Sequence, residues 1–182
     1  MPVRRVVTGH TAEGKSVFIS DGPTPRIATA RAAPGTVIEA LWATDNGMTA
    51  VPGSDDPTPN MITLVPGHGG TRFVVTVFPP ESTALPPLPN DVDPAELVEE
   101  LAARIPGLAQ AMEPDHPGMH TTDTVDYVIV ISGDLWLELD DGAMTQLRPG
   151  DVVVQTGTRH AWRNRGATPA VIYGVLVGAP RD

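Results

Sequence analysis

The fold is decided by residues 118–166, which read GMHTTDTVDYVIVISGDLWLELDDGAMTQLRPGDVVVQTGTRHAWRNRG. Short runs of β-branched and apolar residues alternate here with turn residues. Asp140-Asp141-Gly142 separates the runs 135–139 and 144–147, and it is a strong hairpin signal because Asp-Gly tolerates the positive φ of a tight turn. Strands this short, with turns this regular, predict an all-β barrel or sandwich.

The residues before this stretch predict an extension of the same β-structure, followed by a helical segment. Candidate strands are 3–8, 16–20, 27–31, 37–43 and 72–78. Residues 46–70 are expected to form a long irregular loop that could close over a bound metabolite. Asp93 and Pro94 form a helix start. The apolar residues that follow recur at helical spacing and are expected to pack against the barrel: Leu97, Leu101, Ile105 and Leu108.

We therefore predict one domain over residues 1–182. It consists of an N-terminal β extension and loop (1–80), a helical segment (86–112) and a core (118–178).

Composition excludes several classes of function. The chain has no cysteine, which removes disulfides, thiolate nucleophiles and cysteine-ligated zinc. Its formal net charge of −10 makes nucleic acid an unfavourable partner. No apolar run approaches the length of a membrane span, and no signal-peptide pattern follows the basic N-terminus, so we expect a cytoplasmic protein without membrane contact.

Polar side chains at alternate positions mark the candidate site. Residues two apart on a strand project from one face. The face that contains His120 is polar at its start and apolar at its end, as expected for a pocket with a solvent-exposed entrance and an apolar base. His160 follows a glycine turn before another strand and supplies a second imidazole. Two imidazoles and a carboxylate suit Fe, Mn, Ni or Zn and leave coordination positions open. The face contains His120, Thr122, Thr124, Asp126, Val128 and Val130.

These residues resemble the two motifs of the cupin superfamily. The resemblance implies a double-stranded β-helix, or jelly-roll barrel, with an N-terminal strand extension and one or two short helices, as in small bacterial single-domain cupins. It also implies a homodimer. Thr122 replaces the family's second histidine, Asp126 replaces its glutamate, and Gln155 stands where proline is usual. The matching residues are Gly118, His120, Asp126 and Gly133 in the first motif, and Gly150, Asp151, Gly157, His160 and Asn164 in the second.

The resemblance and the strand pattern together assign roles to seven residues. A divalent metal ion is expected on His120, Asp126 and His160, and Asp126 and His160 are also the candidate catalytic residues. The expected contacts of a small-molecule substrate are Thr122, Thr124, Gln155 and Trp162.

Three functions remain open from the sequence. The first is a metal-dependent enzyme acting on a small organic metabolite by Lewis-acid or dioxygen chemistry, of the lyase, isomerase or dioxygenase type. The second is a metal-free acid–base enzyme resembling a dehydratase or cyclase, with His160 and Asp126 transferring protons. The third is a small-molecule-binding protein without turnover.

Overall fold

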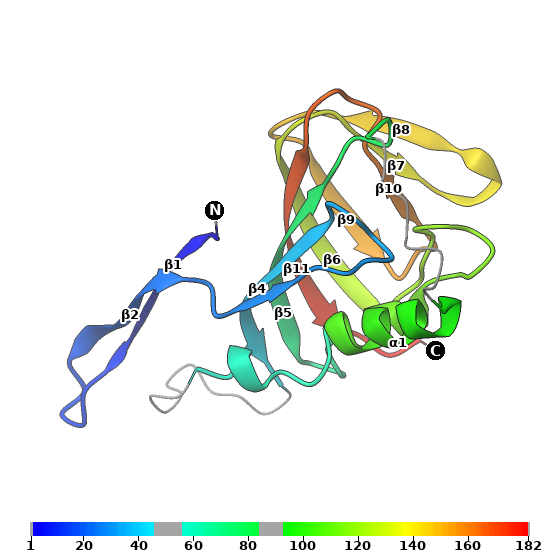
Figure 1. The fold of residues 1–182 in the computed structure, drawn as a ribbon. Helices are drawn as coiled ribbons and strands as arrows, with labels where there is room; N and C mark the ends of the chain where they lie inside the picture. The colour runs from blue at the N-terminus through cyan, green and yellow to red at the C-terminus, as the bar shows by residue number, and fades with distance from the viewer. Residues whose placement is uncertain (1, 46–55, 84–92, 182) are drawn as a thin grey trace.

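The computed structural model describes residues 2–45, 56–83 and 93–181 and contains two sheets that face each other (Figure 1). All strand pairs are antiparallel. The larger sheet has the order β3 (Arg26–Ala28), β4 (Val37–Thr44), β5 (Thr71–Phe78), β11 (Ala170–Gly178), β6 (Thr124–Ser132), β9 (Val152–Thr156). The smaller sheet has the order β10 (Ala161–Arg163), β7 (Leu135–Glu138), β8 (Met144–Leu147). A separate hairpin joins β1 (Arg4–His10) to β2 (Ser16–Pro23).

One apolar cluster holds the two sheets together. The larger sheet contributes Val128, Val130 and Ile172, and the smaller sheet contributes Leu135 and Leu147, all of them buried. The alternation of inward and outward side chains brings these residues onto facing surfaces. The predicted all-β jelly-roll barrel is therefore confirmed.

A second apolar cluster covers the other end of the larger sheet. Here α1 (Pro94–Arg104) and α2 (Leu108–Ala111) pack against β4 and β5. Asp93 caps α1 as predicted, since its carboxylate accepts a hydrogen bond from the backbone N–H of Ala95. Ile105 is buried in this cluster and Leu101 and Leu108 pack against it, so the predicted packing is confirmed for these three residues of the stripe but not for Leu97. Residues 86–92 of the predicted helical segment lie outside the described residues.

The predicted loop 46–70 is only partly a loop. Residues 46–55 lie outside the described residues, but residues 56–70 contribute the buried side chains Met61 and Leu64 to the second cluster. They contain a short 3-10 helix, η1 (Thr58–Asn60). The guanidinium of Arg72 donates to the carbonyl of Thr63 and ties this segment to β5. Residues 56–70 are thus part of the core, because apolar side chains and a buried arginine hold them there.

The predicted hairpin of the smaller sheet is confirmed, with one addition. Residues 140–142 form a 3-10 turn, η2 (Asp140–Gly142), in which Asp141 and Gly142 both have positive φ. The predicted strand 27–31 is shorter than expected, because a turn closed by Ala33 N–H to Ala30 O follows β3. Among the described residues no helix is long and apolar enough to cross a membrane.

Candidate functional site

The strand alternation predicted for the polar face is present from Thr122 onward, but not at His120, which precedes β6 and is half-buried beside the buried Met119. Thr122, Thr124 and Asp126 are buried, whereas their neighbours Asp123 and Tyr127 are exposed. Val128 and Val130 continue the buried face into the cluster between the sheets. Buried polar side chains therefore share the inward face of β6 with the apolar cluster between the sheets.

Asp126 and Gln155 lie directly opposite each other on β6 and β9. Both side chains are almost fully buried, at 7% and 3% exposure. Gln155 Oε1 accepts a hydrogen bond from the hydroxyl of Thr158 (2.5 Å), but its Nε2 has no partner. Asp126 Oδ1 also has no partner. Buried polar atoms without hydrogen bonds are rare in proteins, so this pair marks a place where a bound group can supply them.

The two histidines of the sequence motifs come together beside this pair. His120 and His160 form an isolated antiparallel bridge through two backbone hydrogen bonds of 3.0 Å. Their rings lie 4.2 Å apart between centroids. His120 Nδ1 contacts the carbonyl of Gly118 at 3.0 Å, and His160 Nδ1 contacts that of Thr158 at 2.9 Å. Since only a protonated nitrogen can donate to a carbonyl, each Nε2 keeps its lone pair.

Burial sets the charge of the site. The pKa of His160 is lowered to about 4, mainly by burial and also by the neighbouring His120, while the hydrogen bond to Thr158 opposes the shift. The pKa of His120 is lowered as well, again mainly by burial. Burial raises the pKa of Asp126, and a hydrogen bond from Thr124 opposes that rise. Both imidazoles are therefore uncharged at neutral pH, the form that binds a metal or accepts a proton.

The sequence reasoning missed Arg159. Its guanidinium bonds both carboxylate oxygens of Glu113, at 2.5 and 2.6 Å, and reaches Asp140 at 3.0 Å. Glu113 lies in the segment that leads to His120, so the ion pair holds that segment against the loop that carries His160. The only signal in the sequence was the position of Arg159 directly before His160.

The remaining predicted residues border the site. The hydroxyls of Thr122 and Thr124 bond each other at 2.8 Å. Trp162 meets the ring of His160 edge-on, at 5.8 Å between centroids, and also packs against the apolar cluster between the sheets. Asn164 is fully buried and donates to the carbonyls of Phe78 and Thr168, so it holds the loop before β11 to the end of β5.

The predicted metal ligands have the chemistry that a divalent ion requires, but the structure brings only two of the three, His120 and His160, into contact. Two imidazole Nε2 atoms and an unpartnered carboxylate oxygen are suitable donors. The hydrogen bonds at both Nδ1 atoms are those that orient ligating histidines. However, within residues 2–45, 56–83 and 93–181 no three His, Cys, Asp or Glu side chains lie close enough to hold one ion. The two histidines adjoin; their joint use with Asp126 stays a prediction.

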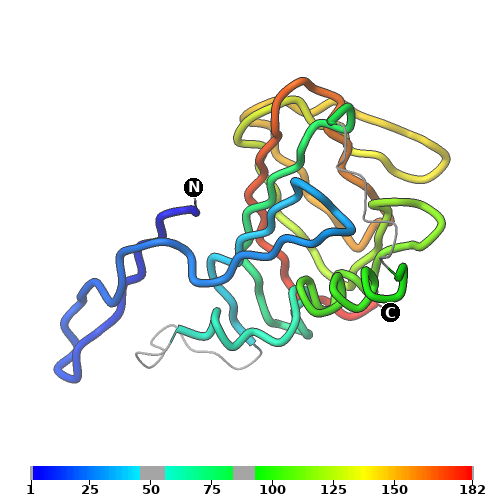
Figure 2. The backbone as a smooth tube through the Cα atoms, in the orientation of Figure 1, coloured from blue at the N-terminus to red at the C-terminus, as the bar shows by residue number. Residues whose placement is uncertain are grey.

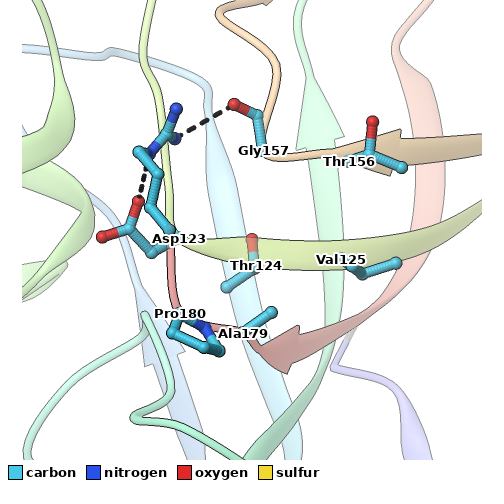
Figure 3. A pocket seen from close by; sticks show the side chains of 8 residues that line it. Asp123, Thr124, Val125, Thr156, Gly157, Ala179 and Pro180 are labelled. Carbon is cyan, nitrogen blue, oxygen red and sulfur yellow. Dashed lines mark hydrogen bonds and ion pairs between the residues drawn. The ribbon is translucent and has the colours of Figure 1, made fainter.

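A separate small pocket lies at the ends of β6, β9 and β11 (Figure 3). Arg181 borders it and bonds Asp123 at 2.8 Å and the carbonyl of Gly157 at 3.1 Å. Thr124 reaches this pocket, but its lining includes none of His120, Asp126 and His160. It is therefore distinct from the histidine site.

The neutral histidines predict a specific pH dependence of stability. The unfolded chain binds a proton at His160 near pH 6.5, whereas the folded protein does so only near pH 4. The stabilising contribution is thus present above pH 6.5 and is lost as pH falls toward 4, by up to about 1.4 kcal/mol per pH unit. In metal-free protein, His160→Gln should flatten this part of the unfolding free-energy profile measured in urea. The exposed His68→Gln is the control. An unchanged slope in His160→Gln would contradict the neutral assignment.

Comparison with known proteins gives a family for the part of the chain that forms the site. Residues 109–177 match the family model described as "Cupin domain". These residues include both histidines, Asp126 and Gln155.

Three curated relatives from fungi show different extents of similarity. The Oryzines biosynthesis cluster protein J of Aspergillus oryzae is 41% identical over 45% of this chain and 51% of its own length. The Phomopsin biosynthesis cluster protein D of Diaporthe leptostromiformis is 50% identical over 28% of this chain and 26% of its own length. A cupin-domain-containing oxidoreductase of Hypocrea virens is 28% identical over 95% of this chain and 74% of its own length. The matches to the first two thus span about half, or less, of those relatives.

The solved structures are more distant. An RmlC-like cupin family protein with a double-stranded β-helix fold from Methanocaldococcus jannaschii has a TM-score of 0.38 and 13% identity, over 63% of this chain and 75% of that one. The assignment of the fold rests on the strand topology and on the family match.

Proposed function

Residues 109–177 form a cupin domain, and from this premise we propose that the protein is a small-molecule enzyme that works with a divalent metal ion held by His120 and His160. Relatives named as oxidoreductases favour redox chemistry among the reaction classes that the sequence leaves open. The substrate is a small organic metabolite, as the biosynthesis-cluster names of other relatives suggest.

The observation that carries the proposal is the pair of unpartnered atoms on Asp126 and Gln155 beside two uncharged imidazoles. Buried polar side chains are normally hydrogen-bonded, so the unpartnered atoms of Asp126 and Gln155 beside the two histidines favour a bound ligand at this place. Gln155 Nε2 is a donor for a substrate oxygen, because Thr158 holds the other end of the amide.

Each residue has a part in this proposal. His120 and His160 hold the ion through Nε2, and Asp126 is the carboxylate that completes the set. A divalent ion there supplies Lewis acidity or a site for dioxygen. Thr122 and Thr124 supply hydroxyls along the same face, and Trp162 limits the space beside His160. The apolar cluster beneath excludes water.

Metal loading tests the proposal. Untagged protein incubated without oxygen with Fe(II), Mn(II), Ni(II) or Zn(II) should retain one of these ions after gel filtration, as measured by elemental analysis. His120→Ala and His160→Ala should each bind it at least about tenfold more weakly, because loss of an orienting partner alone costs tenfold or more. The exposed His68→Ala is the matched control. Equal, negligible metal in the wild type and both variants would refute metal dependence.

A second candidate is metal-free acid–base catalysis by Asp126 and His160. The opposite pKa shifts favour it, since burial makes Asp126 a weaker acid and His160 a weaker base than usual. The shifts bring the pKa values of the two groups closer together, which eases proton transfer between them. Ligand binding or turnover that survives a chelator would support this candidate. Ligand binding without any turnover would support the third hypothesis, a small-molecule-binding protein that is not an enzyme.

A further inference from the structure

His120 takes its position from a loop and not from a strand. It precedes β6, and isolated bridges pair it with Met112 on one side and with His160 on the other. Residues 113–119, which we call the cap loop, lie between Met112 and His120. In Figure 2 the chain runs from the helices through the cap loop and then into the barrel along β6. The place of His120 therefore depends on how the cap loop is held.

The contacts within the cap loop fix its ends and leave its middle to other groups. The backbone N–H of Glu113 donates to the carbonyl of Met119 at 2.9 Å, and Met119 is buried. Residues 114–118 are exposed. Gly118 has a φ of 80° and presents the carbonyl that contacts His120 Nδ1. The ring of His120 is thus oriented by an exposed turn, which needs support from outside the loop.

Arg163 on β10 supports the middle of the cap loop. Its Nη1 donates to the carbonyl of Pro117 at 2.7 Å, and its Nε donates to Glu138 on β7 at 2.6 Å. A Cβ atom on Gly118 would come within 3.2 Å of the same Nη1, so the guanidinium lies against the turn itself. The side chains of Arg163 and Glu138 are 23% and 22% exposed, which limits screening of their charges. The turn that orients His120 is therefore tied to β7 through one side chain.

Arg159 supports the start of the cap loop in the same manner. It bonds both carboxylate oxygens of Glu113, and it also reaches Asp140 in η2. A bidentate arginine–carboxylate pair fixes orientation as well as distance. Arg159 and Arg163 lie on either side of His160 in the sequence, and both link the cap loop to the hairpin of β7 and β8. The segment that carries one histidine thus holds, at two points, the loop that leads to the other.

We propose that Arg159 and Arg163 are positioning residues of the histidine site, an inference that rests on the proposed function. Neither guanidinium can bind the ion, because both are cationic. Arg163 acts on His120 through the turn at Gly118, so that Nδ1 stays the donor and Nε2 stays free for the ion. Arg159 acts through the loop before His160 and keeps the two rings adjacent. Ligands that are held in place before the ion arrives lose less conformational freedom on binding, so these contacts raise affinity.

The Zn(II) affinity of the full chain is the first measurement. In competition with a chromophoric chelator, Arg159→Met and Arg163→Met should each bind Zn(II) about tenfold more weakly than the wild type, the low end of the usual loss when a metal ligand is no longer oriented. Arg31→Met is the matched control, since it removes an arginine–glutamate pair between the turn after β3 and α1. Arg159→Glu combined with Glu113→Arg should recover most of the affinity, because the pair is rebuilt with its charges exchanged.

The tautomer of His120 in metal-free protein is the second measurement, and a purely structural role of the arginines would leave it unchanged. Long-range proton–nitrogen NMR spectra at neutral pH distinguish a ring protonated at Nδ1 from one protonated at Nε2. The wild type should carry the proton at Nδ1 on both His120 and His160. Arg163→Met should give His120 a mixture of the two tautomers and leave His160 unchanged, because the contact with Thr158 is untouched. His120→Gln and His160→Gln assign the signals, and circular dichroism checks that the variants fold.

The two measurements separate this inference from the proposed function. A wild type without Zn(II) affinity, but with an altered His120 tautomer in Arg163→Met, would count against the metal site and still support the positioning role. An unchanged tautomer in Arg163→Met would overturn the positioning role at any affinity. Unchanged affinity in both arginine variants of a protein that binds Zn(II) would overturn it as well. Weaker binding in both variants but not in Arg31→Met, together with the altered tautomer, supports it.

Discussion

Replacing Arg72 with methionine is expected to lower the free energy of unfolding by about 3–5 kcal/mol, because it takes the donor from three backbone carbonyls at about 1–3 kcal/mol for each one left unsatisfied. Arg72 is only 2% exposed, and its guanidinium is fully engaged. It donates to the carbonyls of Thr63, Thr44 and Thr71 at 2.7–2.8 Å, and to Asp45 at 3.0 Å. Methionine fills much of the space but leaves carbonyls without donors inside the protein.

Urea denaturation of Arg72→Met measures this loss. The control is Arg31→Met, which removes a half-exposed arginine bonded to Glu100 at 2.6 Å. A surface pair of this kind contributes about 1 kcal/mol or less. Because Arg72 bonds Thr63, hydrogen exchange should also accelerate in residues 61–70. Equal losses in the two variants would show that the bonds of Arg72 contribute no more than a surface pair.

Replacing Asp126 with valine should have the opposite effect and stabilise the protein by about 1–3 kcal/mol, the usual cost of an unsatisfied buried polar group. Asp126 Oδ1 has no partner, and the next residue on the same face is the buried Val128. Valine also suits a β-strand. The same substitution should abolish metal or ligand binding, because it removes the carboxylate of the proposed site.

The gain from Asp126→Val should depend on pH. Burial raises the folded pKa of Asp126 above its ordinary value of 3.8. The folded state therefore holds the proton more tightly than the unfolded state, and the penalty is absent below pH 3.8 and grows as pH rises through the folded pKa. Urea denaturation at pH 7 should thus show a larger gain than at acidic pH. Asp123→Val, an exposed neighbour bonded to Arg181, is the control. A destabilised Asp126→Val would contradict the assignment of Asp126 as unsatisfied.

The two predictions differ in sign although both residues are buried and ionisable. Arg72 has every nitrogen bonded, whereas Asp126 keeps an oxygen without a partner. We therefore expect Arg72 to act in stability and Asp126 in binding, because Asp126 keeps an oxygen that a bound group can complete.

Much of the barrel could be predicted from local patterns. The Asp140-Asp141-Gly142 turn, the cap at Asp93 and the alternation from Thr122 to Val130 depend on neighbours within a few residues, and all were confirmed. The packing of residues 56–70 could not be predicted, because Met61 and Leu64 meet partners far away in the chain. For the same reason Arg159 was missed, since Glu113 is 46 residues away.

The sequence by itself determined which side chains share the inward face of β6, because a strand turns alternate residues to opposite sides. It also determined the turns, since these depend on local φ preferences. Only the tertiary structure decided that His120 meets His160, that Gln155 lies opposite Asp126, and that Arg72 is bonded while Asp126 is not. Those relations depend on strand register and on loops that cross between sheets, so they are set by packing across the whole barrel.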